Sequence, residues 1–105
     1  MDRDAFLRRV KELLSEAFGD RLQGVVLYGS EARGEAQPDS DIDVIVLLRG
    51  PVNEVADTRN VIRTLYSLQP EVGFRPIDAY PVDVREYEAG LWAVYRNARQ
   101  EGVRV

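Results

Sequence analysis

The order of apolar and polar segments in this 105-residue chain predicts a mixed α/β (α+β) fold, in which a small three-stranded sheet is flanked by helices. Segments with helical spacing of apolar residues alternate with short, continuous apolar runs that are typical of buried strands. No repeat, linker or low-complexity segment interrupts this order, and we expect residues 1–105 to form a single domain. Helices interleaved with a small sheet are typical of the α/β or α+β class.

The first two elements are a predicted helix and a predicted strand. Residues 4–18 carry apolar side chains at helical spacing, and Gly19 ends the predicted helix. Residues 24–28 form a short apolar run that is closed by Gly29. A run of this length and composition predicts a buried strand.

The central strand is predicted after a long connection. Residues 29–40 are rich in Gly, Ser, Pro and Asp and are expected to be mostly loop. Residues 42–48 are the most apolar stretch of the chain and predict the central strand, which ends at residues 49–51. Because the connection holds no full helix, we expect the first two strands to be antiparallel neighbours.

A second helix and a third strand follow. Pro70 ends the predicted helix, and residues 74–80 form the third predicted strand, in which Pro76 indicates a sheet edge or a bulge. The helix is long enough to cross over to a parallel strand. Its predicted apolar face consists of Val55, Val61, Ile62, Leu65, Tyr66 and Leu68.

The last predicted helix begins at a capping box. Asp83 is the expected N-cap, with Glu86 three residues later, and Gly102 is the expected C-cap. Gly90 could divide this helix in two. Its predicted buried stripe consists of Val84, Tyr87, Leu91, Val94, Tyr95 and Ala98.

Composition excludes several classes of function. The chain has no Cys and no His, which excludes disulfides, common structural zinc sites and Ser-His-Asp or Cys-His hydrolases. Its net charge of −4 argues against direct binding of DNA or RNA, because such proteins carry a surplus of Lys and Arg. The first residues lack the pattern of a signal peptide and no run is long enough for a membrane span, so we expect a cytoplasmic protein without membrane association.

The connection after the first strand has the outline of a phosphate site. Gly29 allows positive φ and close backbone approach, and Ser30 places a hydroxyl beside backbone N–H groups. Gly29 and Gly34 have the spacing of a Walker A loop, but Glu35 and Ala36 stand where that motif needs Lys and Ser or Thr. The loop is therefore not a P-loop, and as an isolated feature it could be a simple turn.

Asp41 and Asp43 form a second candidate site at the entry to the central strand. Strand side chains alternate between faces, so both carboxylates point to one side. At about 6–7 Å they repel each other by about 2–3 kcal/mol at an effective dielectric constant near 20, unless a cation lies between them. With oxygen ligands alone, the expected ion is Mg²⁺ or Mn²⁺. The alternative is that this acidic pair belongs to a turn that follows Pro38 and Asp39. We interpret Asp39 itself as a turn residue.

Asp78 is a third candidate acid, in the middle of the last predicted strand. If this strand lies beside the one that begins at Asp41 and Asp43, three carboxylates converge on one face and could hold two metal ions for phosphoryl transfer. The alternative is an edge-strand charge that discourages aggregation. Glu31 and Glu35 are predicted to be solvated.

Together these segments resemble a known family. Residues 29–34, Gly-Ser-Glu-Ala-Arg-Gly, followed by Ser-Asp-Ile-Asp-Val at residues 40–44, are similar to the G-S-x-A-R-G…S-D-x-D motif of the polymerase-beta nucleotidyltransferase superfamily. The brevity of the chain resembles the minimal nucleotidyltransferase (MNT) branch.

The resemblance implies an activity and a set of residues. It implies transfer of AMP from ATP to a hydroxyl, with Gly29 and Ser30 on the triphosphate and Asp41 and Asp43 on two Mg²⁺ ions. Asp78 would complete the coordination of the metal ion that activates the acceptor hydroxyl and could help to take its proton. Asp83 is the alternative candidate for this third acid. Arg33 would brace the loop or face the phosphates. Such transfer needs no His, since it depends on positioning and charge neutralisation.

The resemblance also implies a partner. In the MNT branch the usual partner is a HEPN-type ribonuclease toxin, and the MNT protein is an antitoxin that adenylylates a tyrosine of the toxin. We expect the acceptor to lie on a separate molecule or a second subunit, in a homo- or hetero-oligomer. Two alternatives remain open: a binding module that neutralises its partner by contact alone, with Trp92 as a candidate anchor, and an adenylyltransferase of a small molecule.

Overall fold

The computed structural model describes residues 2–105, and its sheet contains four strands in the order β3-β2-β1-β4. The α-helices are α1 (Arg3–Phe18), α2 (Gly29–Arg33), α3 (Glu54–Leu65), α4 (Val84–Glu88) and α5 (Ala93–Glu101). The strands are β1 (Leu22–Tyr28), β2 (Ile42–Leu48), β3 (Ile77–Asp83) and β4 (Val103–Arg104). Short 3₁₀ turns are η1 (Gly19–Arg21), η2 (Tyr66–Leu68) and η3 (Pro70–Val72).

The strand pairing confirms the predicted topology and adds one strand to it. β1 and β2 are antiparallel, and β3 runs parallel to β2 after the α3 crossover, as the sequence predicts. The expectation of three strands is wrong, because β4 pairs with β1 at Val26↔Arg104 and Leu27↔Val103. β4 has only two residues and therefore leaves no periodic pattern in the sequence.

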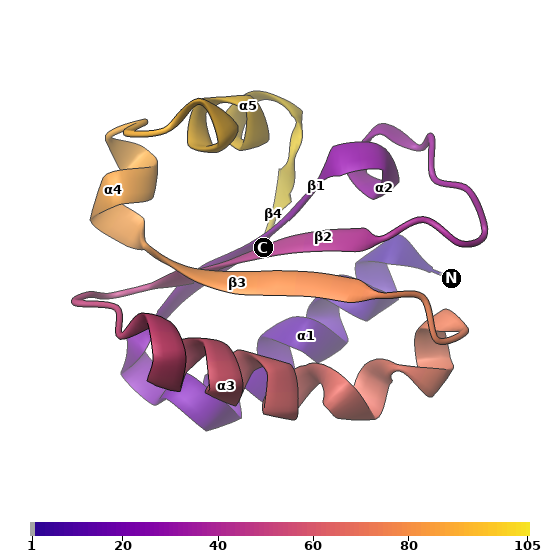
Figure 1. The fold of residues 1–105 in the computed structure, drawn as a ribbon, viewed down its shortest axis with the longest axis horizontal. Helices are drawn as coiled ribbons and strands as arrows, with labels where there is room; N and C mark the ends of the chain where they lie inside the picture. Colours follow the sequence, from indigo (N-terminus) through magenta and orange to yellow (C-terminus); the bar gives the residue numbers. More distant parts are fainter. Residues whose placement is uncertain (1) are drawn as a thin grey trace.

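Helices cover both faces of the sheet but not equally. In Figure 1, α1 and α3 lie below the sheet, whereas α2, α4 and α5 lie above it. The lower face packs a larger core, formed by every second residue of the central strands and by the helices. The main residues of this core are Phe6, Leu7, Val10, Leu14, Val25, Leu27, Val44, Val46, Leu48, Val61 and Leu65.

Helix α1 agrees with its prediction almost to the residue. The Asp2 side chain caps it by accepting hydrogen bonds from the backbone N–H groups of Asp4 and Ala5. Gly19 ends it with a φ of 56°, a conformation that glycine adopts without strain. None of the helices in residues 2–105 combines the length and the apolar composition of a membrane-spanning segment.

Helix α3 buries a narrower stripe than the sequence predicts. Val61 and Leu65 of α3, and Leu68 of the following turn η2, pack into the lower core at the i, i+4, i+7 spacing of one helix face. The remaining apolar residues of the predicted face are exposed, because α3 contacts the sheet along this single stripe. They are Val55, Ile62 and Tyr66.

The C-terminal segment differs most from prediction. β3 begins three residues later than expected, although its edge position is confirmed, and Asp83 caps α4 by accepting from the N–H of Arg85. Gly90, with a φ of 64°, separates α4 from α5, so the single predicted stripe is broken and Leu91 and Val94 are exposed. Gly102 is extended instead of left-handed, although its N–H still bonds to the Ala98 carbonyl.

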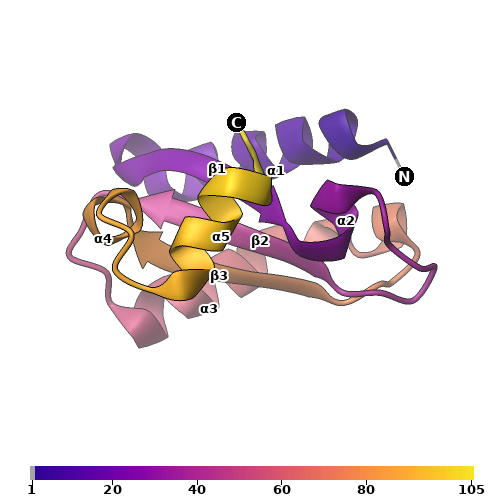
Figure 2. The same cartoon turned by 90° about the horizontal axis from the view of Figure 1, so that it is seen from above.

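The upper face has a smaller core that stops partway along the sheet. Val26, Ile45, Leu47 and Val82 pack against Tyr87 of α4 and Ala98 of α5. Seen from above in Figure 2, α4 lies at one end of the sheet and α2 at the other, with α5 between them. The upper face beside α2 is the place where the predicted site residues meet.

Candidate active site

Asp43 and Asp78 lie side by side on the upper face, because they are register partners in the parallel pair β2 and β3. Alternation along β2 places Asp43 on the same face as Ile45 and Leu47, which belong to the upper core. Asp43 is half-buried, whereas Asp78 is exposed. Asp41 is exposed and lies just before β2 begins at Ile42. Strands β2 and β3 are therefore adjacent, as the three-acid hypothesis requires.

The surroundings of Asp43 disfavour its negative charge. The pKa of its carboxyl is raised, first by burial and then by repulsion from Asp78 and Asp41. Arg33 acts in the opposite direction, and its positive charge lowers the pKa of Asp43. Asp43 thus experiences the charges of both other candidate acids.

The acids do not by themselves form a closed metal cage. Within residues 2–105, no three Asp, Glu, His or Cys side chains are grouped closely enough to hold an ion. The donor set nevertheless fits Mg²⁺, which usually binds through one or two carboxylates together with substrate phosphates and water. A divalent cation would also offset the repulsion that raises the pKa of Asp43.

Gly29 brings the backbone of the motif against the Asp43 side chain. Its φ is 73°, in the left-handed region that favours glycine, and a Cβ at this position would overlap the Asp43 carboxylate. Gly34 has the same φ, but a Cβ there would meet nothing within 4 Å. Only Gly29 therefore combines the left-handed conformation with a need for close approach to an acid.

The connection that the sequence predicts to be mostly loop begins with a short helix. α2 begins at Gly29, and Ser30 lies in its first turn, half-buried. At the other end the Ser30 carbonyl accepts a hydrogen bond from the N–H of Glu35, with a donor–acceptor distance of 2.9 Å. The fold thereby places Ser30 next to Gly29 and its Asp43 contact.

Arg33 braces α2 against two carboxylates. Its Nε donates to Glu35 at 3.0 Å, and its Nη1 lies 3.6 Å from a carboxylate oxygen of Glu101 in α5. The side chain is exposed, and its charge still acts on Asp43. Of the two roles proposed for Arg33, bracing is the one that these contacts support.

Two tyrosines lie on the same upper face and were not singled out by the sequence. The hydroxyls of Tyr28 and Tyr80 are 2.7 Å apart, and the rings meet edge to face with centroids 6.4 Å apart. Burial and the charges of Asp43 and Asp78 raise the pKa of both tyrosines. The available signal was alternation, since Tyr28 ends β1 and Tyr80 lies two residues after Asp78.

Glu31 differs from its prediction. It is half-buried, with its carboxylate 2.6 Å from Nη1 of Arg75, because α2 lies against the segment that leads into β3. Arg75 also donates from Nε to the Ser40 carbonyl at 2.9 Å. No pattern in the sequence singled out Arg75.

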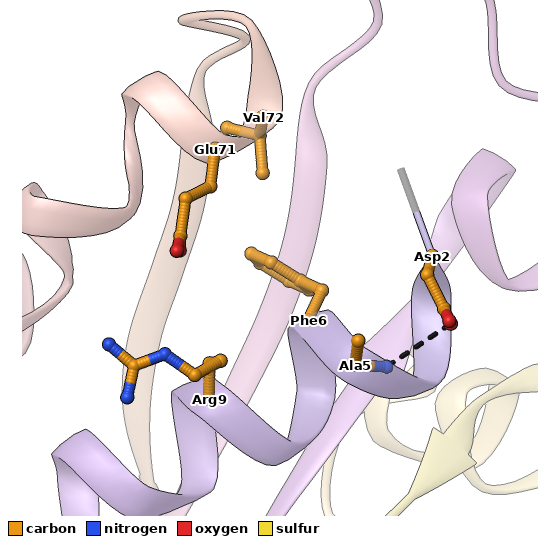
Figure 3. Close-up of a pocket in the computed structure, with 6 residues that line it drawn as sticks. All are labelled: Asp2, Ala5, Phe6, Arg9, Glu71 and Val72. Carbon is orange, nitrogen blue, oxygen red and sulfur yellow. Dashed lines mark hydrogen bonds between the residues drawn. The ribbon is translucent and has the colours of Figure 1, made fainter.

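A cavity of about 200 Å³ opens on the lower side of the molecule, away from the predicted site residues. Figure 3 shows its lining, in which Phe6 and Val72 form an apolar floor and Arg9 and Glu71 stand at one side. Both apolar residues belong to the lower core, so the sheet separates this cavity from Asp43 and Asp78.

Comparison with known families and sequences gives consistent results. A family model described as a nucleotidyltransferase domain matches residues 7–105. Two proteins of Methanocaldococcus jannaschii are similar in sequence. "Putative protein adenylyltransferase MJ0141" is 30% identical over 73 residues, which are 68% of this chain and 73% of the relative. "Putative protein adenylyltransferase MJ1305" is 36% identical over 62 residues, which are 59% of this chain and only 40% of that relative.

Solved structures share the fold. A toxin–antitoxin crystal structure with AMP-PNP has a TM-score of 0.61 at 22% identity, covering 92% of this chain and 69% of that one. A putative nucleotidyltransferase from Sulfolobus solfataricus has a TM-score of 0.61 at 23% identity, covering 96% and 79%. A putative minimal nucleotidyltransferase has a TM-score of 0.56 at 22% identity, covering 98% and 95%.

Proposed function

Because this chain belongs to the nucleotidyltransferase domain family, we propose that it transfers AMP from ATP to a protein hydroxyl in a reaction that depends on Mg²⁺. The proposed acceptor is a tyrosine of a HEPN-type toxin, for which this chain would be the antitoxin. The expected location is the cytoplasm, where ATP and such a partner are available.

The observation that carries this proposal is the position of Asp43. It pairs with Asp78 across two parallel strands and contacts Gly29, at the start of the motif helix. The pKa of Asp43 is raised first by burial and then by repulsion from Asp78 and Asp41, and a bound cation would offset that repulsion. One face of the sheet therefore brings together a candidate metal site and a candidate phosphate loop.

Each candidate residue has a role in this proposal. Asp41, Asp43 and Asp78 would hold Mg²⁺, or Mn²⁺ in its place, together with the phosphates of the substrate. The bound ions supply neutralisation of phosphate charge. Gly29 and Ser30 would bind the triphosphate through backbone N–H groups and the Ser30 hydroxyl, and Arg33 would keep α2 in place through Glu35 and Glu101.

The reaction is a substitution at phosphorus. The acceptor hydroxyl oxygen forms a bond to the α-phosphorus of ATP, and the bond from that phosphorus to the bridging oxygen of the β-phosphate breaks. Pyrophosphate leaves with the bonding electron pair, and the hydroxyl proton passes to the Asp78 carboxylate. Asp78 is exposed beside the half-buried Asp43, so an acceptor on another molecule could approach it.

The proposal of a protein partner rests on the relatives. Two similar proteins of Methanocaldococcus jannaschii carry the name "putative protein adenylyltransferase", and a structure with the same fold is a toxin–antitoxin with AMP-PNP. These names describe the other proteins. We transfer the partner and its tyrosine to this chain as part of the proposal.

The decisive experiment follows label from ATP. The chain is incubated with ATP labelled at the α-phosphate, Mg²⁺ and a HEPN-type partner, and labelled protein is detected after denaturing electrophoresis. We expect label on the partner, and at least a 10²–10³-fold slower reaction for Asp43→Asn, because neutralisation of charge in the transition state is lost. Asp39→Asn is the matched control, since it removes the same charge from an exposed turn position. Equal labelling by both variants would contradict the proposal.

An alternative function, neutralisation of a partner by contact alone, is favoured by one observation. Trp92 is 59% exposed, and the exposed Leu91 precedes it. Exposed aromatic side chains often anchor protein interfaces. In this case Trp92→Ala would abolish neutralisation and Asp43→Asn would not. Transfer of label to a small molecule, without any protein acceptor, would indicate the third possibility.

A further inference from the structure

Arg75 connects three segments that the candidate site needs in fixed positions. Its Nε donates to the Ser40 carbonyl at 2.9 Å, directly before Asp41. Its Nη1 lies 2.6 Å from the carboxylate of Glu31, in the middle of α2. Arg75 itself stands two residues before β3, the strand that carries Asp78. The single guanidinium thus contacts the motif helix and the entry of β2 from the segment that leads into β3.

The ion pair between Arg75 and Glu31 is half-buried, and its hydrogen bonding is incomplete. The Arg75 and Glu31 side chains are 12% and 16% exposed. Within residues 2–105, Nη2 of Arg75 has no hydrogen-bond partner, and the close carboxylate oxygen of Glu31 lies outside hydrogen-bonding geometry. A half-buried ion pair with incomplete hydrogen bonding is poorly suited to stabilise a fold, because desolvation offsets much of its attraction.

A second ion pair in the molecule shows what a well-bonded arrangement looks like. Arg21 donates to both carboxylate oxygens of Asp57, at 3.0 and 2.9 Å, and Asp57 also accepts from the N–H of Asn53. This pair ties the start of β1 to the start of α3, at the opposite end of the two strands from Asp43 and Tyr28. It provides a matched control for the Arg75 pair.

The backbone next to Arg75 is held in a strained conformation. Phe74 has a φ of 60°, although the residue is 74% exposed and gains little from burial. A bulky residue in the left-handed region persists only where its surroundings impose it. Here the Gln69 side chain donates to the Arg75 carbonyl at 2.8 Å, and the N–H of Ile42 donates to the Pro76 carbonyl at 2.8 Å. These bonds fix the turn that points Arg75 toward Ser40.

We propose that Arg75 is a positioning residue that sets the distance between the motif helix α2 and the acids of β2 and β3. By holding Glu31 and the Ser40 carbonyl together, it keeps Gly29 and Ser30 in place relative to Asp41 and Asp43. This role rests on the proposed function, in which both groups bind one nucleotide. Within residues 2–105, Arg75 forms no hydrogen bond or ion pair with Asp41, Asp43 or Asp78, and in this proposal it acts through Glu31 and Ser40.

The test uses two matched double variants of the full chain. Glu31→Gln with Arg75→Gln removes the positioning pair without leaving an unpaired charge, and Asp57→Asn with Arg21→Gln does the same for the second pair. Amide hydrogen exchange is measured residue by residue for the N–H groups of Glu35, Ser40 and Ile42. Binding of ATP in the presence of Mg²⁺ is measured by calorimetry, well below the melting temperature of each variant.

We expect the Glu31/Arg75 variant to exchange these amides at least about tenfold faster and to bind ATP about 10- to 100-fold more weakly, because loosened groups lose their preorganisation. The Arg21/Asp57 variant should melt at a lower temperature and leave both readouts unchanged. Arg75→Lys alone should bind ATP with an affinity between those of the unmodified chain and the Glu31/Arg75 variant, since an ammonium can reach one of the two partners.

Unchanged exchange in the Glu31/Arg75 variant, or faster exchange with unchanged ATP affinity, would overturn the positioning role. Equal weakening of ATP binding by both double variants would also overturn it, because the effect would then follow general stability. If the unmodified chain binds no ATP with Mg²⁺, the proposed function fails, and faster exchange at these amides would still assign loop holding to Arg75.

Discussion

The two ends of the upper sheet face differ, although the same strands form both. At one end Ile45, Leu47 and Val82 pack beneath α4 and α5 and are almost fully buried. At the other end the same alternation places Asp43 and Asp78, neither of them fully buried. In Figure 2, α4 lies over the first end and α2 lies near the second.

The difference shows how a small sheet can provide both a core and a polar site. Strand alternation fixes which face a residue occupies, but the helices decide how far along that face apolar packing extends. Where α4 and α5 no longer cover the sheet, charged side chains avoid the free-energy cost of full burial. The tyrosine pair, Tyr28 and Tyr80, lies at the boundary, with half-buried side chains and hydroxyls that bond to each other.

The largest loss of stability is expected at the covered end. Leu47 is 0% exposed, and Leu47→Ala should lower the free energy of unfolding by about 2–5 kcal/mol because it leaves a cavity. Denaturant unfolding measures this change. Leu91→Ala, at a position 54% exposed, is the control and should change stability by no more than about 0.5 kcal/mol. Equal losses for the two variants would contradict the assignment of a packed core at this end.

The second prediction concerns the contact between Gly29 and Asp43 at the open end. Gly29→Ala should destabilise the fold by about 1–3 kcal/mol, since it adds strain at positive φ and displaces the Asp43 carboxylate. Gly34→Ala has the same φ and open space around the new Cβ, so it measures the strain alone. Nucleotide binding should be weakened by Gly29→Ala and retained by Gly34→Ala. Similar binding by both would show that the Asp43 contact is unimportant.

The third prediction is a pH dependence that comes from Asp43. Folding raises the pKa of this carboxyl, so the folded state binds the proton more tightly than the unfolded state. The stability that Asp43 contributes is therefore present below its unfolded pKa of about 3.9 and is lost as the pH rises through the folded value.

Melting temperatures of the metal-free protein and of Asp43→Asn, measured from pH 3 to pH 7, test this effect. The variant should melt a few degrees higher at pH 7 and at the same temperature near pH 3. Added Mg²⁺ should narrow the difference at pH 7 by stabilising only the unmodified protein. A variant that melts lower than the unmodified protein at pH 7 would contradict the prediction.

The smallest effect is expected for the tyrosine pair at the boundary. Tyr28→Phe should cost about 1 kcal/mol, because the Tyr80 hydroxyl is left half-buried without its partner. The double change Tyr28→Phe with Tyr80→Phe should cost no more than the single one, since no orphaned hydroxyl remains. Thermal unfolding of Tyr28→Phe, Tyr80→Phe and the double variant measures this coupling, and strictly additive losses would show that the hydrogen bond contributes nothing.

The fold was predictable where local pattern and local packing agree. The helix over residues 4–18 and the strand over residues 42–48 matched closely, because each buries an uninterrupted apolar stripe or run. The segment after Asp83 was predicted less well. The division of the helix at Gly90, which the sequence allowed for, is confirmed, but the apolar periodicity continues across it, so the exposure of Leu91 was not predicted.

The residues of the candidate site were likewise predictable only in part. The Gly29–Ser30 loop and the Asp41–Asp43 pair were visible as local motifs, whereas Asp78 depended on strand adjacency, which the register of β2 and β3 provides. Arg75 could not be found, because its partners Glu31 and Ser40 lie 44 and 35 residues away in the chain. A long-range ion pair leaves no periodic trace in a single sequence.

The sequence by itself determined the chemistry available to this protein: oxygen ligands without His or Cys, a glycine loop, and an acidic pair at the entry to the central strand. These properties are local, since residue type and strand alternation define them. Only the tertiary structure decided which distant groups meet there, namely Asp78 beside Asp43 and Arg75 against Glu31. The reason is that register and helix coverage result from packing of the whole chain, in which residues far apart in sequence become neighbours.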